Sequence, residues 1–219
     1  MFENIINMAK GVLGSKFTMP ERLAPKVIVP ASFPLQIDFN NARKWSKIVM
    51  HHSYTPDGVN TNDWEGIRKY HMSYRYNGDT ISAEKAAELK AKGDKGVLDP
   101  WPTIAYHFGV EEDKGGLIYR LGCPLSKIGY HTKGFNSAAI GVCLLGNYGG
   151  NFDGSDGKVP TSEQYNKLAM LVKHLMKKFS IKVSNVYGHR ETYVLLGEPV
   201  EKTCPGSKFS IDHFKSLLA

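Results

Sequence analysis

The chain has 219 residues, of which 42% are hydrophobic and 22% are charged, a balance typical of one folded globular domain. Its net charge of +7 favours a polyanionic partner, such as an anionic membrane or a bacterial wall with acidic polymers, but no dense run of lysine and arginine indicates nucleic acid, and we expect none as a partner. Because no stretch approaches the roughly 18 apolar residues of a membrane helix and the N-terminus lacks a secretory signal, we expect a soluble chain made in the cytoplasm.

Residues 1–40 form a predicted N-terminal extension. Apolar residues recur at three- and four-residue spacing through residues 1–16, which predicts an amphipathic helix. We expect this helix to dock on the main body, and weak contact with a membrane surface stays open as the alternative. Four prolines between residues 17 and 40 predict a strap without regular structure, so we place the main domain at residues 41–219.

The front of the main domain begins with a short apolar run, residues 47–50, that predicts a buried strand leading into His51-His52. A capped helix is predicted from residue 61 to about residue 74. Residues 75–102 are then predicted to be an insertion with a polar turn and a short helix at 82–92. Its charged composition indicates a solvated flap, while Trp101 at its exit is suited to stack on a sugar ring.

The middle of the chain predicts two paired strands, at 103–111 and 117–120. Adjacent side chains on a strand face opposite ways, so Tyr106 and His107 cannot both point into one site. The continuous apolar run at 138–146 predicts a central strand that is buried on both faces, which makes Cys143 a core thiol.

The back of the chain continues to alternate helices and strands. A long helix is predicted to begin after Pro160 and to run to about Phe179, followed by a short strand at 181–186. An amphipathic helix at 210–218 closes the chain. We therefore expect an α/β fold: a single domain with a central mixed β-sheet flanked by helices.

The candidate metal ligands lie far apart in the sequence. His189 and Cys204 supply an imidazole and a thiol on a segment expected to be irregular, and His51 is the natural source of a third ligand. The three cysteines of the chain are too few and too scattered for a disulfide framework. Two histidines and one cysteine around zinc would leave the fourth position open, as in catalytic rather than structural zinc sites.

Five short motifs occur in one order along the chain: Ile48-Val49-Met50-His51-His52-Ser53, Ile104-Ala105-Tyr106-His107-Phe108, His131-Thr132-Lys133-Gly134-Phe135-Asn136 with Ile140-Gly141, Gly188-His189-Arg190-Glu191, and Lys202-Thr203-Cys204-Pro205-Gly206. This series resembles the zinc-dependent N-acetylmuramoyl-L-alanine amidases of phage lysozyme type, whose superfamily includes animal peptidoglycan recognition proteins. The resemblance spans about residue 47 to the C-terminus, without residues 1–40 and much of 75–102. The segment Thr192–Glu201 is longer than the link usual in this family.

The resemblance implies a single zinc ion held by His51, His189 and Cys204. Because metal-bound histidines usually donate their other nitrogen to a carboxylate or carbonyl, Arg190 and Glu191 are candidates to orient His189.

The resemblance assigns further residues to catalysis and substrate binding. Lys202 would stabilise the negative charge of the tetrahedral intermediate, and Tyr106 would handle the proton that passes to the leaving amine. His131 and Asn136 match the loop that lines the muropeptide groove, and Trp101 is the candidate for contact with a sugar.

The resemblance implies a monomeric peptidoglycan hydrolase that cleaves the amide bond between N-acetylmuramic acid and L-alanine, as a phage endolysin or a related bacteriolytic enzyme acting on the bacterial cell wall. Two alternatives stay open. A recognition module would bind muropeptides without cutting them, but such members generally lack the cysteine ligand, so Cys204 argues against it. A cysteine hydrolase would use Cys204 with His189, for which Pro205 and the spare His51 are awkward.

Overall fold

The computed structural model describes residues 33–55 and 63–219. The predicted N-terminal helix, most of the proline-rich strap and the predicted start of the helix at residue 61 lie outside the described residues. Within those two ranges, no helix combines the length and apolar character needed to cross a membrane.

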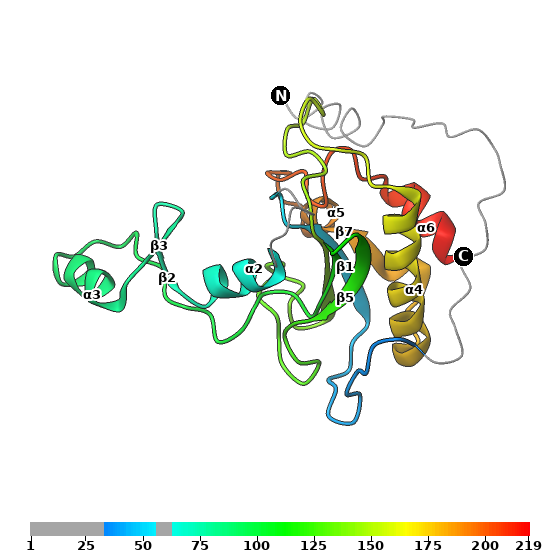
Figure 1. The fold of residues 1–219 in the computed structure, drawn as a ribbon, viewed down its shortest axis with the longest axis horizontal. Coiled ribbons are helices and arrows are strands. Elements are labelled where there is room, and N and C mark those ends of the chain that lie inside the picture. Colours follow the sequence, from blue (N-terminus) through cyan, green and yellow to red (C-terminus); the bar gives the residue numbers. More distant parts are fainter. Residues whose placement is uncertain (1–32, 56–62) are drawn as a thin grey trace.

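A five-stranded mixed sheet forms the centre of the molecule (Figure 1). Its order is β5 (Gly116–Leu121), β4 (Phe108–Asp113), β6 (Ala139–Leu144), β1 (Lys47–His52) and β7 (Val186–Gly188). β4, β6, β1 and β7 run parallel to one another, while β5 pairs antiparallel with β4. The predicted α/β class with a central mixed sheet is therefore confirmed.

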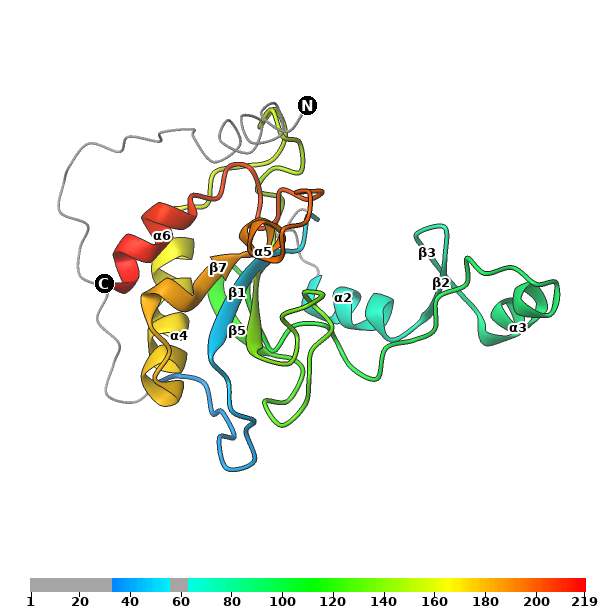
Figure 2. The same ribbon diagram turned by 180° about the vertical axis from the view of Figure 1, so that it is seen from behind.

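Helices cover both faces of this sheet (Figures 1 and 2). α4 (Ser162–Phe179) and α6 (Ile211–Leu218) lie on one side, and α2 (Asp63–His71) lies on the other. α4 begins as the sequence predicts, because the Thr161 side chain accepts a hydrogen bond from the backbone of Gln164 and the Gln164 side chain accepts one from the backbone of Thr161.

The alternation of side chains along β1 assigns His51 to one face of the sheet. Ile48 and Met50 belong to the main hydrophobic core, together with Leu168, Leu171 and Leu175 of α4. Val49 packs in a separate cluster with Phe135. Since side chains two residues apart share a face, His51 points to the side of Val49, away from α4.

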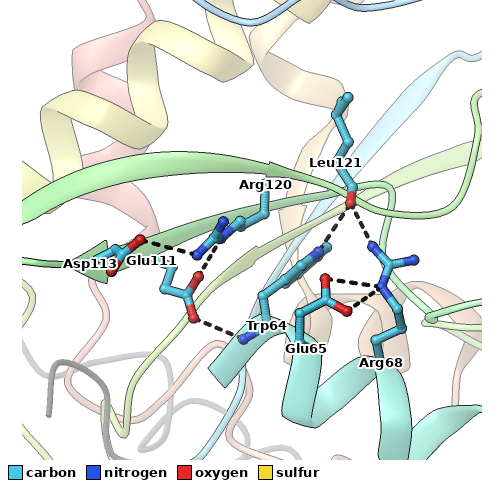
Figure 3. A network of polar contacts seen from close by, with 7 residues as sticks. All are labelled: Trp64, Glu65, Arg68, Glu111, Asp113, Arg120 and Leu121. Carbon is cyan, nitrogen blue, oxygen red and sulfur yellow. Dashed lines mark hydrogen bonds and ion pairs between the residues drawn. The ribbon is translucent and has the colours of Figure 1, made fainter. Parts of the chain in front are cut away.

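A buried carboxylate anchors α2 to the sheet (Figure 3). The Glu111 side chain accepts hydrogen bonds from the backbone nitrogen of Trp64, at 2.8 Å, and from Nε of Arg120. The indole nitrogen of Trp64 and the guanidinium of Arg68 both donate to the carbonyl of Leu121, at 3.0 and 3.1 Å. These contacts fix the direction in which α2 leaves the sheet.

Residues 72–101, which we call the arm, project from the body of the molecule (Figures 1 and 2). The arm contains the hairpin of β2 (Tyr74–Tyr76) and β3 (Asp79–Ile81), followed by α3 (Ala83–Ala91) with Ser82 as its N-cap. The helix predicted within the insertion is thus confirmed. At the base of the arm, the backbones of Arg75 and Leu98 exchange two hydrogen bonds of 2.8 and 3.0 Å.

The structure corrects the predicted secondary structure in four places. The helix predicted to reach residue 74 ends at His71, because β2 starts at Tyr74. Residues 103–107 are not a strand, since β4 begins at Phe108. The strand predicted at 181–186 is instead a 3₁₀ turn, Val183–Asn185, followed by β7. The helix α5 (His189–Leu196) was missed, although Glu191 in its first turn and Gly197 just after its end are helix signals.

Candidate metal centre

The structure brings the three predicted metal ligands together. The ligand atoms of His51, His189 and Cys204 all lie within 4.8 Å of one another. Nδ1 of His51 is 3.5 Å from Sγ of Cys204. Zinc bonds of about 2.1 Å to nitrogen and 2.3 Å to sulfur at a tetrahedral angle would separate the two atoms by about 3.6 Å. The donor types and their spacing therefore fit a zinc ion.

His51 is held by the sheet. It lies near the end of β1, paired with Cys143 of β6, and its side chain is buried. Burial lowers the pKa of His51 well below its ordinary value, and the neighbouring His189 and His131 lower it further. The imidazole is therefore neutral at neutral pH, the form in which histidine binds metal.

His189 opens α5 directly after β7. The backbone nitrogen of Gly188, the residue before it, donates to the Glu191 carboxylate at 2.8 Å, which fixes the start of the helix. Burial lowers the pKa of His189 to about 4, with a smaller contribution from the positive charge of Lys202. Like His51, it is therefore neutral and able to bind a metal.

Arg190 holds the segment that carries Cys204. Its guanidinium donates to the carbonyls of Thr203 at 3.0 Å, Gly206 at 2.6 Å and Phe209 at 2.9 Å. Its backbone nitrogen donates to the carbonyl of Cys204 at 2.7 Å. The Arg190 side chain therefore fixes the cysteine turn, and the expectation that Arg190 orients His189 stays a prediction.

The thiol of Cys204 is protonated in the metal-free chain. Burial raises the pKa of Cys204 to about 12, although a backbone hydrogen bond from His52 and the positive charges of Arg190 and Lys202 act in the opposite direction. Because the thiolate is the reactive form of cysteine, this thiol alone is a poor nucleophile. A bound metal would displace this proton, whereas a cysteine hydrolase would need the thiolate without a metal, so the burial of Cys204 weighs against the hydrolase.

A cavity of about 410 Å³, the first cavity, opens over the three ligands and is also lined by Tyr106 and Lys202. The Tyr106 ring lies 5.1 Å from the ring of His51. Burial raises the pKa of Tyr106 well above its ordinary value, with further contributions from Cys143 and Cys204, so its hydroxyl keeps its proton. Both predicted catalytic side chains thus share the cavity of the ligands, while their roles stay predictions.

Trp101 lies at the base of the arm and also lines the first cavity. Its ring is 4.8 Å from the ring of His71 and 5.9 Å from that of Tyr130, and the buried guanidinium of Arg75 lies 4.5 Å above it. His71 is fixed in turn because its Nδ1 accepts from the backbone of Ala105 at 3.3 Å. An aromatic wall is therefore built beside the metal ligands.

His131 and Asn136, the predicted muropeptide contacts, are placed differently from Trp101. The His131 ring is buried and points its Nδ1 at Nε2 of His51, 3.1 Å away, although the residue still borders the first cavity. Oδ1 of Asn136 accepts from the backbones of His131 and Thr132, at 3.1 and 2.6 Å. These polar atoms therefore have partners within the protein, and their contact with substrate stays a prediction.

A second cavity, of about 320 Å³, also borders His189. It is built largely by α5 and the segment after it, within the stretch Thr192–Glu201 that is longer than usual. Its wall includes three charged side chains, Lys133, Glu198 and Glu201. His189 and Glu201 line both cavities, so the two cavities are adjacent at these residues.

Comparison with known structures finds several similar chains. An N-acetylmuramoyl-L-alanine amidase, LysC, from Clostridium intestinale URNW is 20% identical, with 81% of this chain and 87% of that chain covered and a TM-score of 0.44. Bumblebee PGRP-SA is 20% identical, with coverage of 76% and 78% and a TM-score of 0.49. A mutant endolysin from Bacillus subtilis is 19% identical, with coverage of 84% and 95% and a TM-score of 0.40. No curated protein sequence matches the chain.

The family comparison covers the main domain. The sequence profile of the N-acetylmuramoyl-L-alanine amidases matches residues 41–207. This range contains the three clustered ligands as well as Tyr106 and Lys202. Because the match extends over most of the chain, the protein belongs to the N-acetylmuramoyl-L-alanine amidase family.

Proposed function

We propose that the chain is a zinc-dependent peptidoglycan hydrolase that cleaves the amide bond between N-acetylmuramic acid and L-alanine. The observation that carries this proposal is the cluster of His51, His189 and Cys204 at the wall of a cavity of about 410 Å³. Membership of the amidase family supports the reaction class. Cys204 also favours an enzyme over a module that only binds muropeptides, since it completes a catalytic type of zinc site.

The surrounding side chains are suited to amide hydrolysis. A zinc ion bound by two imidazoles and a thiolate keeps a fourth position open and lowers the pKa of a bound water to about 7. Lys202, which is exposed in the first cavity, provides a positive charge for the oxyanion that develops from the substrate carbonyl. Tyr106 retains its proton because burial raises its pKa, so its hydroxyl can donate to that oxygen or to the leaving amine.

We propose that the two cavities bind the two parts of the substrate on either side of the scissile bond. Trp101 and Tyr130 in the first cavity present flat apolar rings that suit the sugar ring of N-acetylmuramic acid. Lys133 and Glu198 in the second cavity present charges that suit the carboxylates and amines of a peptide stem. Because His189 lines both cavities, we infer that the amide joining sugar and peptide binds at the metal centre.

The place of action follows from the substrate. We propose that the protein is made in the cytoplasm and acts as a monomer on the bacterial cell wall, as a phage endolysin or a related bacteriolytic enzyme. The net charge of +7 supports attraction to a wall that carries acidic polymers.

Product analysis tests this function. Digestion of purified peptidoglycan by the zinc-loaded protein is expected to release new N-terminal L-alanine without new reducing sugars, and Cys204→Ser is the matched inactive control. New reducing sugars would identify a glycosidase instead. Binding to peptidoglycan without any released product would identify a recognition module.

A further inference from the structure

The hydrogen on the His131 ring can be placed from its surroundings. Nε2 of His131 lies 3.1 Å from the carbonyl oxygen of Ala139. A carbonyl oxygen only accepts hydrogen bonds, so Nε2 carries the hydrogen. The ring is buried among His51, His107 and Thr132, none of which carries negative charge, and burial without an anionic partner favours the neutral form. A neutral ring with hydrogen on Nε2 has a lone pair on Nδ1.

That lone pair determines the tautomer of His51. Nδ1 of His131 lies 3.1 Å from Nε2 of His51, so a lone pair on both atoms would place two acceptors face to face. A hydrogen on Nε2 of His51 removes this conflict. Oγ1 of Thr132, 3.3 Å from the same nitrogen and 3.0 Å from Nδ1 of His131, fits this arrangement because a hydroxyl can accept from one ring and donate to the other. His51 then has its lone pair on Nδ1, the atom 3.5 Å from Sγ of Cys204.

We propose that His131 is a positioning residue for the metal. Its Nδ1 accepts a hydrogen bond from Nε2 of His51, which fixes the tautomer of His51 whose Nδ1 faces the metal. The chain of hydrogen bonds runs from Nε2 of His51 to His131 and from Nε2 of His131 to the carbonyl of Ala139. A hydrogen bond to the far nitrogen of a metal-bound histidine both orients the ring and raises its basicity. This role deepens the proposed function, on which it rests for the presence of a metal.

The packing around His131 holds the ring in this orientation. A Cβ atom at Gly141 of β6 would lie 2.7 Å from Cγ and Cδ2 of His131, so the ring rests against a strand surface that only glycine leaves free. The two hydrogen bonds to Oδ1 of Asn136 fix the backbone of His131 and Thr132. Asn136 therefore fixes the backbone that carries His131, and the His131 ring in turn holds Nε2 of His51.

Zinc affinity of two variants at the same position tests the proposal without relying on activity. His131→Leu removes the acceptor and is expected to weaken zinc binding by about 10- to 100-fold, the range typical of lost partners of metal-bound histidines. His131→Asn can place Oδ1 near the former Nδ1 and is expected to retain affinity within a few-fold. Competition with a chromophoric chelator measures both, after circular dichroism has shown that each variant is folded. Equal losses in the two variants, or no loss in either, would overturn the proposal.

Nitrogen-15 NMR of the His51 ring in the wild-type protein provides a test that does not depend on the folding of a variant. The expected result, with and without zinc, is hydrogen on Nε2. Hydrogen on Nδ1, or zinc bound through Nε2, would contradict the proposal. If the wild-type chain binds no zinc at all, the proposed function fails, while the tautomer of the metal-free His51 still decides this inference.

Discussion

The two halves of the metal centre are held by different means. His51 comes from β1, where strand pairing and buried neighbours fix it. His189 and Cys204 come from the start of a helix and from an irregular turn, which the guanidinium of Arg190 joins through backbone carbonyls. The difference teaches that the sheet positions its ligand through burial and register, whereas the turn depends on one polar side chain.

Acid is expected to have the largest effect, and it acts through the buried histidines that surround His51. Burial lowers the pKa of His107 to about 4 and that of His131 to about 3. Because both values lie below the unfolded value of about 6.5, the unfolded chain takes up protons first as the pH falls. The stability that these groups contribute is full above pH 6.5 and is lost as the pH falls from 6.5 to about 4 for His107 and to about 3 for His131.

The expected loss in the free energy of unfolding is about 3 kcal/mol for a single histidine shifted from 6.5 to about 4, and larger when several are involved. Urea unfolding of the metal-free protein at pH values from 7 to 4 measures it. His107→Gln is the matched variant and should show a shallower dependence on pH. A free energy of unfolding that stays constant between pH 6.5 and 4.5 would mean that the buried imidazoles are not held neutral.

Arg190 tests the other half. Arg190→Met removes the donors of three backbone carbonyls. One hydrogen bond to a charged group is worth about 1.5–3 kcal/mol, and bonds from one side chain do not add, so we expect the free energy of unfolding to fall by about 3 kcal/mol. Zinc affinity should fall with it, because the turn that carries Cys204 is released. Urea unfolding and chelator competition measure the two effects.

Arg190→Lys separates charge from geometry. Lysine keeps the positive charge but lacks the planar fork that reaches several carbonyls at once, so it should restore only part of the lost stability and affinity. Full restoration by lysine would show that Arg190 acts through its charge and not by holding the turn.

Lys133→Ala is expected to have the smallest effect of these changes, and it tests the substrate site beside the half that carries His189. An exposed charge in the wall of the second cavity contributes about 1 kcal/mol to the binding of a carboxylate, so Lys133→Ala should raise KM about five-fold with little change in kcat. Steady-state hydrolysis of a soluble muropeptide measures this. Lys114→Ala, in the exposed turn between β4 and β5, is the control and should match the wild type. Equal KM values for all three proteins would remove Lys133 from the substrate site.

The regular elements and the three ligands were the easier features to predict from the sequence. The apolar run before His51 predicts only a buried strand, and the apolar spacing in residues 162–179 predicts only a helix, because burial selects the residue types. The three ligands were identified because His51, His189 and Cys204 each lie in one of the five motifs that occur in one order along the chain. Tyr106 is predicted within a strand that in the structure begins only at Phe108, yet it lines the first cavity while its neighbour His107 is buried.

The back half could not be predicted to the same extent. The hydrogen bonds of the Arg190 side chain go to backbone carbonyls 13 to 19 residues further along the chain, and no pattern of side chains encodes such partners. The helix α5 was hidden because its short sequence was read as a link. The hydrogen-bond partner of the His131 ring could not be predicted from the sequence, since the direction of the ring depends on the space left by Gly141.

The metal content of the purified protein tests the central claim most directly. Elemental analysis of the wild-type chain after incubation with zinc and removal of excess metal is predicted to find one zinc ion per chain, and the same analysis of Cys204→Ser is predicted to find much less. A wild-type chain that retains no zinc, or a Cys204→Ser variant that retains zinc as tightly as the wild type, would contradict a metal centre built by His51, His189 and Cys204.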